Sequence, residues 1–381
     1  MIPRTLFEAE HEQFRDSVRK FLETEAVPYH DQWEKDGHVD RALWNKAGEM
    51  GFLAPTMPEA YGGLGLDFRY NAVIDEEISR MGLSGIGIGL HSDITVPYIV
   101  NHGSEEMKEK YLPACLTGEL VTAIAMTEPG TGSDLQSIKT TALLDGDEYV
   151  INGSKTFITN GQLADLVIVV AKTDPSAGAS GTSLILVEAG TPGFEKGQNL
   201  EKVGLKAQDT SELFFQDARV PKANLLGEEG MGFVYLMQEL PQERLNIAIS
   251  AVAGAASVVE QTVDYVKQRK AFGKPVAAFQ NTQFKLAEMD AEVSAMQVFV
   301  DRCLELHLDG KLDAVTASKA KMLATDLQCK VVDECVQLHG GYGYMWEYPV
   351  ARAFADARVQ RIYGGTNEIM KLIIGRQLLA D

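Results

Sequence analysis

The spacing of apolar residues changes twice along this chain, and this change constrains the fold more than any single motif. In the N-terminal third the apolar residues recur at helical spacing, and "SEEMKEKYLPACLTGEL" predicts a further helix with Ser104 as its N-cap. Five apolar residues share one predicted helix face: Phe7, Phe14, Val18, Phe21 and Leu22. After about residue 121 short β-prone runs replace this pattern, and from Gly232 the helical period returns. The order α–β–α predicts an α+β protein with segregated layers.

The middle stretch carries the signals of an antiparallel β domain. Its β-prone runs are separated by Asp145-Gly146, Asn152-Gly153 and Asn160-Gly161, dipeptides that supply the positive φ values of tight hairpins. The runs "LVIVVAKT", "TSLILVEAG" and "SELFFQDARV" continue the same pattern. We therefore expect a barrel or a sandwich in this part of the chain.

The C-terminal stretch predicts a bundle of long helices. Four helical segments are expected at about 241–269, 280–308, 313–338 and 349–379. A chain of 381 residues is too long for one core. We expect three domains: an N-terminal α-helical domain at 1–120, a middle antiparallel β-barrel or sandwich domain at 121–231, and a C-terminal four-helix bundle at 232–381.

Charge and cysteine content narrow the possible partners. The net charge of −19 disfavours nucleic acid and anionic membrane surfaces, because both attract basic patches. The four cysteines and seven histidines show no metal-ligand spacing, so we expect neither a metal site nor a disulfide framework. The N-terminus lacks the apolar region of a signal peptide, and no apolar run reaches about 18 residues. We expect a bacterial cytoplasmic protein, with the mitochondrial matrix as the alternative.

The motifs of several large enzyme classes are missing, whereas four glycine- and hydroxyl-rich turns are present. There is no G-x-G-x-x-G after a strand, no Walker A loop, no H-E-x-x-H and no G-x-S-x-G. The turns are "AMTEPGTGSD" (125–134), "FITNG" (157–161), "QRKAFGK" (268–274) and "QLHGGYGYMWEYP" (337–349). Each alone is typical of an ordinary loop, and Glu128 and Asp134 are expected as turn and cap residues. Their joint occurrence in this order is much more specific.

Together these turns resemble the acyl-CoA dehydrogenase family over nearly the whole chain, from "FRDSVRKFLE" to "NEIMKLIIGRQL". The segments "GLKAQDTSELFF", "LPQERL" and "YVKQRKAFGK" are most similar to its long-chain members. The resemblance implies a homotetramer with FAD between the β domain and the bundle. It also implies oxidation of a saturated fatty acyl-CoA to the trans-2-enoyl-CoA, with electrons passed to an electron-transfer flavoprotein. The alternatives are an isovaleryl-type branched short-chain enzyme, an acyl-CoA oxidase, and a non-catalytic assembly factor on the same fold.

The resemblance further implies which residues hold the flavin. Thr127 and Thr159 would hydrogen-bond the flavin ring, and Arg269 would meet the FAD pyrophosphate of a neighbouring subunit. An arginine at a helix end is also common as a solvated charge, which is the alternative for Arg269. Phe157 stands where the family commonly has a tryptophan. The implied FAD set is Met126, Thr127, Gly132, Ser133, Phe157, Thr159, Arg269, Gln280, Gln337, Gly340, Gly341 and Thr366.

The catalytic base is missing from its usual place in this family. Most members carry a glutamate after the tyrosine of the loop "RIYGGTNEIM", and here that position is Gly364. The long-chain and isovaleryl subgroups carry the base before an arginine on the first bundle helix, which corresponds to Glu243. Gly364 would still donate its backbone N–H to the thioester carbonyl. The implied substrate-binding residues are Ser133, Arg244, Tyr363 and Gly364.

The position of Glu243 predicts two opposing effects on its pKa. Pro241 suits the first helical position, so Glu243 is expected in the first turn, where the helix dipole lowers its pKa. Burial against flavin and acyl chain raises the pKa, and we expect burial to win. A glutamate at a helix N-terminus is also common without any catalytic role. In the separate stretch "SGIGIGLHSDITV" (84–96), Gly85, Gly87 and Gly89 are expected to leave room beside a helix for a long acyl tail.

Overall fold

The N-terminal part of the chain folds into a group of helices, and the computed structural model describes residues 3–380. These helices are α1 (Ala9–Glu25), α2 (Val27–Asp36), α3 (Arg41–Glu49), α4 (Phe68–Arg80), the π-helix η2 (Leu90–Thr95), α5 (Val96–His102) and α6 (Glu105–Thr117). The predicted apolar face of α1 is confirmed, because Val18, Phe21 and Leu22 are buried in one cluster. The predicted cap is confirmed as well, since the Ser104 hydroxyl accepts a hydrogen bond from the Met107 N–H.

One eight-stranded sheet forms the middle of the chain. Its strands are β1 (Thr122–Ala125), β2 (Thr141–Asp145), β3 (Glu148–Thr159), β4 (Leu166–Lys172), β5 (Thr182–Glu188), β6 (Phe194–Asn199), β7 (Thr210–Pro221) and β8 (Leu225–Leu226). The order along the sheet is β6-β7-β3-β2-β4-β5-β8, with β1 beside β4. Most pairs are antiparallel, as predicted, but β1 and β2 run parallel to β4. This difference arises because the chain crosses from β3 to the far side of β2 before it forms β4.

Only one of the three predicted hairpin dipeptides makes a hairpin. Asp145-Gly146 joins β2 to β3, and Gly146 has a φ of 64°. Asn152-Gly153 instead lies within β3 at a register shift against β7, where a Cβ on Gly153 would meet Thr140 Oγ1 at 2.4 Å. Asn160-Gly161 follows β3 and starts the crossover to β4. Two of the hairpins predicted from sequence are therefore wrong, because long β3 bends at bulges instead of turning back.

The C-terminal part is a helical bundle built from α7 (Gly232–Gln268), α8 (Gln280–Leu308), α9 (Ala314–His339) and the shorter α10 (Pro349–Ala357). The two-stranded β9 (Lys270–Ala271) and β10 (Lys274–Pro275) close the turn between α7 and α8. The predicted start of the first helix is wrong: α7 begins at Gly232 and Pro241 lies inside it. Buried Leu236 and Leu240 anchor the turn before this proline.

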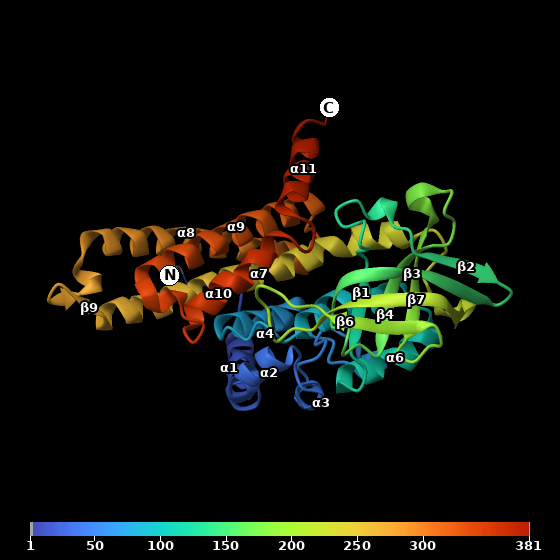
Figure 1. Cartoon of the computed structure of the whole chain (residues 1–381), viewed down its shortest axis with the longest axis horizontal. Coiled ribbons are helices and arrows are strands. Elements are labelled where there is room, and N and C mark those ends of the chain that lie inside the picture. Colours follow the sequence, from blue (N-terminus) through green and yellow to red (C-terminus); the bar gives the residue numbers. More distant parts are fainter. Residues whose placement is uncertain (1–2, 381) are drawn as a thin grey trace.

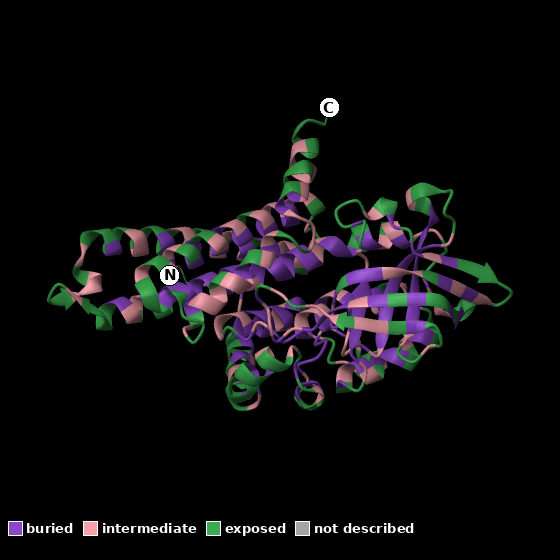
Figure 2. Cartoon of the chain, viewed as in Figure 1, coloured by how far each residue is buried: buried purple, intermediate pink, exposed green. Residues whose placement is uncertain are grey.

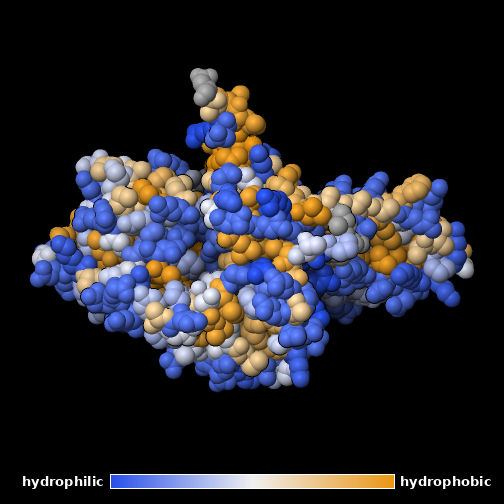
Figure 3. Space-filling model, turned by 180° about the vertical axis from the view of Figure 1, so that it is seen from behind, coloured by the Kyte–Doolittle hydropathy of each residue, from blue (hydrophilic) through white to orange (hydrophobic). Residues whose placement is uncertain are grey.

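The fourth predicted helical segment is also interrupted. It consists of α10, the short η8 (Arg358–Arg361), a loop, and α11 (Asn367–Leu378). Gly364 and Gly365, with φ of 62° and 88°, turn the chain between them. As a result α11 projects from the body of the molecule (Figure 1). Apolar side chains cover part of this projecting helix (Figure 3), and Leu372, Leu378 and Leu379 are exposed by 44%, 74% and 85%.

The helix α7 runs through the centre of the fold. An 18-residue window of α7 has a mean hydropathy of 1.2, which is enough by length and composition to cross a membrane, but 72% of this window is buried inside the protein. Figure 2 shows buried positions along most of its length. It contacts α4, α8 and α9. The apolar composition of α7 is therefore accounted for by the core that it fills.

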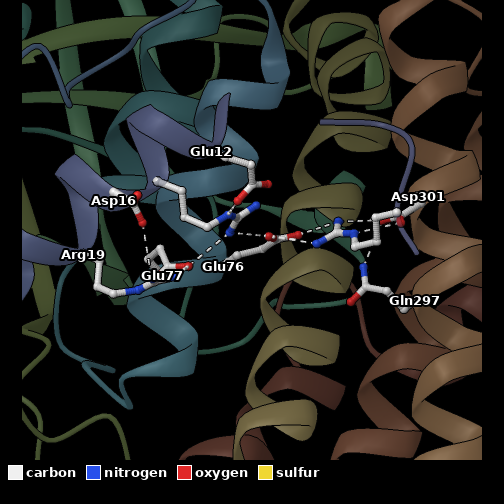
Figure 4. Close-up of polar contacts among 9 residues, drawn as sticks. Glu12, Asp16, Arg19, Glu76, Glu77, Gln297 and Asp301 are labelled. Atoms are coloured by element: carbon white, nitrogen blue, oxygen red, sulfur yellow. Dashed lines mark hydrogen bonds and ion pairs between the residues drawn. The ribbon is translucent and has the colours of Figure 1, made fainter. Parts of the chain in front are cut away.

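A buried ionic network ties the N-terminal helices to the bundle. Glu76 and Glu77 of α4 lie between α1 and α8 (Figure 4). The Arg4 guanidinium pairs with Glu76 at 2.7 Å and with Asp301 of α8 at 2.6 Å. Arg15 of α1 pairs with Glu76 at 2.8 Å and with Glu77 at 3.1 Å. Each of the two glutamates is thus compensated by arginine, and the network fixes how the two helical regions pack.

Candidate active site

Glu243 lies well inside α7, and its carboxyl group is almost completely removed from solvent. The residue is 5% exposed, and the hydroxyl of Tyr98 on α5 donates a hydrogen bond to its Oε1 at 2.8 Å. Burial raises the pKa of Glu243 to about 7; the Tyr98 hydrogen bond opposes this rise, and the nearby Glu239 carboxylate adds to it. The expected first-turn position is wrong, so the helix dipole, which acts within the first turn, does not offset this burial. A carboxylate with a pKa near neutrality suits a general base.

The glycine loop that follows Tyr363 packs directly against the same face of α7. A Cβ on Gly364 would meet Ile247 Cδ1 at 2.4 Å, and Ile247 lies one helical turn beyond Glu243. A Cβ on Gly365 would come within 3.9 Å of Arg244 Nη2. The structure therefore brings together Glu243, Arg244 and Gly364, three residues that the sequence linked only by resemblance. It also explains the glycine, because any larger residue at 364 meets α7.

Two buried cations lie beside this loop, and one of them, Lys321, is bonded to it. Lys321 of α9 is fully buried and donates hydrogen bonds to the Gly365 carbonyl at 2.8 Å and to Asn367 Oδ1 at 2.9 Å. Burial, followed by the charge of Arg244, lowers the pKa of Lys321 to about 8. Arg244 donates to Ser318 Oγ at 3.3 Å, while its Nε has no hydrogen-bond partner among the described residues. Lys321 thus fixes the loop that carries Gly364, whereas Arg244 lies beside this loop and is bonded to α9.

On the β domain, the predicted flavin-side residues lie at the end of β3 and in the adjoining loop. Phe157 sits at a register shift between β3 and β7 with a φ of 59°, and its side chain is 68% exposed. A left-handed backbone and an exposed ring are both unfavourable for a phenylalanine, a combination that marks functional positions. The Thr127 hydroxyl donates to the Thr156 carbonyl, which ties the loop to β3. Gly132 and Ser133 are exposed, and a Cβ on Gly132 would meet no atom within 4 Å.

A buried ion pair supports this loop, and the sequence did not predict it. Lys155 of β3 is fully buried; its ammonium contacts Glu128 Oε1 at 2.9 Å and donates to the Met126 carbonyl at 3.0 Å. Glu128 also accepts hydrogen bonds from the N–H groups of Lys139 and Thr140. The turn role expected for Glu128 is present, since its backbone N–H donates to the Thr131 carbonyl at 2.8 Å, and its side chain adds the ion pair. No sequence pattern indicates which lysine of a β-strand points inward.

The glycines before the π-helix allow close packing and do not leave open space. A Cβ on Gly85 would meet Ala207 Cβ at 2.1 Å, and one on Gly87 would meet Asn160 Oδ1 at 2.2 Å. A Cβ on Gly89 would meet Asp75 Oδ1 at 2.9 Å. The expectation that these glycines make room for an acyl tail is wrong at their Cβ positions, because neighbouring segments already fill them.

The remaining predicted FAD residues gather at the far end of the bundle. A cavity of about 540 Å³ there is lined by Arg269, Gln337, Gly340 and Gly341, among others. The Arg269 guanidinium lies 5.4 Å from the centre of the Tyr342 ring. Neither glycine would place a Cβ within 4 Å of another atom, so a ligand has access to the backbone. Gln280 begins α8 nearby and is exposed, whereas Thr366 caps α11 beside the glycine loop.

These two groups of FAD residues are not brought together within one chain. Gly232, at the start of α7, packs against Ser183 of β5, whereas Arg269 follows the last residue of α7. The helix spans 37 residues, which corresponds to roughly 55 Å. Figure 1 shows the sheet and the β9 turn at opposite ends of the molecule. Within a single chain the two groups therefore lie toward opposite ends of the molecule.

Comparison with known proteins identifies the family. Models of the acyl-CoA dehydrogenase N-terminal, middle and C-terminal domains match residues 8–119, 123–218 and 230–379. The long-chain specific acyl-CoA dehydrogenase of Rattus norvegicus is 54% identical over 99% of this chain and 88% of the relative. The isovaleryl-CoA dehydrogenase of Oryza sativa subsp. japonica is 39% identical over 99% of this chain and 93% of the relative.

Solved structures agree with this match and identify the cofactor. An acyl-CoA dehydrogenase from Geobacillus kaustophilus superposes with a TM-score of 0.97 at 56% identity, covering 99% of this chain and 100% of the other. An acyl-CoA dehydrogenase from Bacillus anthracis, solved as a complex with FAD, superposes with a TM-score of 0.92 at 38% identity, covering 98% and 68%. The glycine-lined cavity and the exposed Phe157 fit such a cofactor. The chain belongs to the acyl-CoA dehydrogenase family, oxidoreductases that use FAD.

Proposed function

We propose that this protein oxidises long, straight-chain saturated acyl-CoAs and that Glu243 is the base that takes the α-proton. The observation that carries the assignment of the base is the contact between α7 and the Gly364 loop. A buried carboxyl group with a raised pKa lies one helical turn along α7 from Ile247, whose side chain packs against a loop that offers a backbone N–H and no side chain. The long-chain preference rests on the higher identity to the rat long-chain enzyme than to the rice isovaleryl enzyme.

Each residue near Glu243 has a distinct part in this proposal. Glu243 accepts the α-proton, and a pKa near 7 allows it to accept and release that proton close to neutral pH. The Gly364 N–H donates to the thioester carbonyl as negative charge develops on its oxygen. Lys321 keeps the loop in place, so that this N–H needs no rearrangement when the charge forms. Arg244, next to the base, contacts the substrate.

The flavin is held by residues of two chains in this proposal. FAD, when bound, supplies the acceptor for the hydride that leaves the β-carbon. Met126, Thr127, Phe157 and Thr159 hold the flavin end, with Gly132 and Ser133 at the edge of the acyl-CoA site. Arg269, Gln280, Gln337, Gly340 and Gly341 of a neighbouring subunit hold the remainder, and Thr366 lies near the pyrophosphate. The separation of these groups along α7 supports a homotetramer, as do the exposed leucines of α11.

Substrate bleaching of the flavin tests the acyl specificity. We expect anaerobic addition of long straight-chain acyl-CoA to reduce the bound flavin fastest, with medium and short chains slower. Isovaleryl-CoA serves as the branched comparison. A short-chain or isovaleryl optimum would overturn the long-chain assignment, and absence of bleaching by every acyl-CoA would indicate a non-catalytic member of the fold.

Reoxidation and assembly are tested separately. We propose an electron-transfer flavoprotein as the acceptor, so reduced enzyme should be reoxidised rapidly by that protein and slowly by air; fast reoxidation in air would indicate an oxidase. For assembly, light scattering should give the mass of four chains, and Arg269→Ala should lower FAD content. A monomer with full FAD occupancy would refute both the tetramer and the shared site. We propose the bacterial cytoplasm as the compartment, with the mitochondrial matrix as the alternative.

A further inference from the structure

Among residues 3–380, Tyr98 is the one outside α7 that makes a direct hydrogen bond with the carboxyl group of Glu243. It lies on α5, a helix of the N-terminal region that begins with Pro97 in its first turn. Its side chain is fully buried, and its hydroxyl donates to Glu243 Oε1 at 2.8 Å. The interaction joins residues 145 positions apart in the sequence, so it bridges the N-terminal helices and the bundle. Nothing in the sequence around "TVPYIVNH" predicts this contact.

The two oxygens of Glu243 have different surroundings. Oε1 accepts the Tyr98 hydrogen bond, while Oε2 accepts none from the described residues. Oε2 is not among the fully buried polar atoms that lack a partner. The small exposed fraction of the residue therefore includes this oxygen. A carboxylate held at one oxygen and open at the other presents a single oxygen, in a fixed direction, to an incoming proton.

We infer that Tyr98 is the positioning residue of the catalytic base: its hydroxyl holds Oε1 of Glu243 so that Oε2 faces the substrate, and it favours the ionised carboxylate. This inference rests on the proposed role of Glu243. The phenol suits the task because burial, and then the charge of Glu243, raises the pKa of Tyr98 well above its usual value. The hydroxyl therefore remains a donor throughout the working pH range. An arginine in its place would lower the pKa of the base further and weaken it as a proton acceptor.

Other charged groups also face Glu243 and have to be kept constant in any test. On α7, Glu239 raises the pKa of Glu243 and Arg244 lowers it. On α5, His102 contacts Glu239 Oε1 at 3.0 Å and Asn101 donates to the same oxygen at 2.9 Å. One turn further along α7, Asn246 donates at 2.6 Å to both Asp75 of α4 and Asp93 of η2. Tyr98→Phe leaves all of these groups unchanged and removes one hydroxyl.

The expected effect is a change in the pH profile. Single-turnover flavin reduction by acyl-CoA requires ionised Glu243, so the rate rises with pH through the pKa of this residue. A hydrogen bond to a charged group favours the ionised form by an amount equivalent to about one to two pKa units. Tyr98→Phe should therefore move the acidic limb upward by about one unit and slow flavin reduction about tenfold at pH values below that limb. Tyr98→Gln, which restores a neutral donor, should recover part of the shift.

A matched control and a second measurement separate positioning from folding. Tyr111 of α6 is also buried and donates to a carboxylate, Glu188 Oε1, at 2.7 Å, so Tyr111→Phe removes a similar interaction far from the base. Tyr111→Phe should leave the acidic limb of the pH profile of flavin reduction at its wild-type pH. The protonation of Glu243 is followed directly by its infrared carboxyl band in the substrate-free holoenzyme, identified by its loss in Glu243→Gln. This band should titrate at higher pH in Tyr98→Phe.

The outcomes distinguish this inference from the proposed function on which it rests. An unchanged limb and an unchanged infrared titration in Tyr98→Phe, with normal FAD content, would show that the hydroxyl is only a packing group and would overturn the inference. If Tyr98→Phe fails to retain FAD, Tyr98→Leu, which also lacks a hydrogen-bond donor, is titrated in its place and decides in the same way. If instead Glu243→Gln reduces its flavin at the wild-type rate, the assignment of the base fails, whatever Tyr98 does.

Discussion

Two groups of buried carboxylates on neighbouring helices have opposite surroundings. On α4, Glu76 and Glu77 accept hydrogen bonds and ion pairs from three arginines, and they lie where the N-terminal helices meet the bundle (Figure 4). On α7, Glu243 is equally buried but has only the neutral phenol of Tyr98 as a hydrogen-bond donor among the described residues. Both helices belong to the same interface, since α4 and α7 are in contact.

The difference separates a structural role from a chemical one. A buried carboxylate that is paired with guanidinium groups has its charge compensated, so it can fix a geometry. A buried carboxylate with no cation hydrogen-bonded to it retains its proton until close to neutrality and can exchange it there. Direct pairing with arginine, more than burial itself, distinguishes the two sites, since Arg244 lies next to Glu243 in the chain but is bonded to Ser318.

The largest expected effect comes from removing the uncompensated carboxylate. Glu243→Gln should slow single-turnover flavin reduction by about 10²–10⁴-fold, because the general base is lost while shape and the Tyr98 contact are kept. FAD content should stay normal. Glu260→Gln, an exposed residue of the same helix paired with Arg80, is the control and should react like the wild type. If Glu243→Gln reduces its flavin at nearly the wild-type rate, Glu243 has no catalytic role.

Removing an arginine from the network around Glu76 and Glu77 should lower the stability of the protein and leave the rate of flavin reduction almost unchanged. Arg15→Met leaves Glu76 and Glu77 with less countercharge at a buried site, so the free energy of unfolding should fall by about 3 kcal/mol. Flavin reduction in the folded fraction should hardly change. The exposed pair of Arg302 and Glu305 provides the control, because Arg302→Met should cost under about 1 kcal/mol. Denaturant titrations of all three proteins give the comparison, and equal losses in both variants would mean that the network adds nothing.

The raised pKa of Glu243 also predicts that the stability of the protein depends on pH. Its folded-state pKa of about 7 lies above the ordinary value of 4.5, so the folded protein binds more protons than the unfolded chain between these values. Stability is therefore lost as pH rises from about 4.5 to about 7. Glu243→Gln abolishes this loss and should be more stable than the wild type at pH 8 by on the order of 2–3 kcal/mol, with little difference at pH 4. Denaturation at fixed protein concentration over this pH range measures it, and a constant difference would refute the raised pKa.

The order of helical and β segments could be predicted from sequence, because hydrophobic periodicity reports directly on which faces are buried. The cap at Ser104 and the buried face of α1 followed from local chemistry alone. The start of α7 did not, since tertiary packing of Leu236 and Leu240 outweighs the usual preference of proline for a helix start. The break between α10 and α11 was missed because a glycine pair within an apolar periodic pattern does not by itself indicate a projecting helix.

The candidate site was predictable only where a motif of the family named a residue. Glu243, Arg244 and Gly364 lie together in the structure. Tyr98, Lys155 and Lys321 were not predicted, although each makes a buried polar contact to a loop or carboxyl group of the site. These residues act through contacts between segments far apart in the sequence. One sequence contains no periodic signal for such contacts, because their spacing depends on how the three parts of the fold pack.

Lys321 extends the comparison of paired and unpaired buried charges from carboxylates to a cation. It is a buried cation that contacts a carbonyl and an amide oxygen, with no carboxylate within hydrogen-bond distance among the described residues. Lys321→Met should let the Gly364 loop shift and slow flavin reduction about tenfold, since small displacements of catalytic groups are costly. Stability should fall little, because the charged group was itself expensive to bury. Lys330→Met on the same helix removes an exposed pair with Glu292 and is the control. A large loss of stability without a change in rate would make Lys321 purely structural.

The smallest expected effect is a partial rescue that moves the carboxylate to the other side of the substrate. In Glu243→Gln, the additional change Gly364→Glu places a carboxylate on the loop that faces α7. The structure predicts why this alone should recover little: the new Cβ would meet Ile247 Cδ1 at 2.4 Å, and the φ of 62° is strained for any side chain.

Ile247→Val removes this Cδ1. The next atom that the new Cβ would meet, Cγ1 of residue 247, lies 3.9 Å away, which is an ordinary contact. The triple variant Glu243→Gln, Gly364→Glu, Ile247→Val should therefore regain flavin reduction several-fold over the double variant, while the remaining backbone strain of about 1–2 kcal/mol keeps it well below the wild type. Glu243→Gln with Ile247→Val alone is the control and should stay inactive. If the double and triple variants are equally inactive with full FAD content, a carboxylate on the Gly364 loop does not reach the carbon that Glu243 serves, and the two positions are not equivalent.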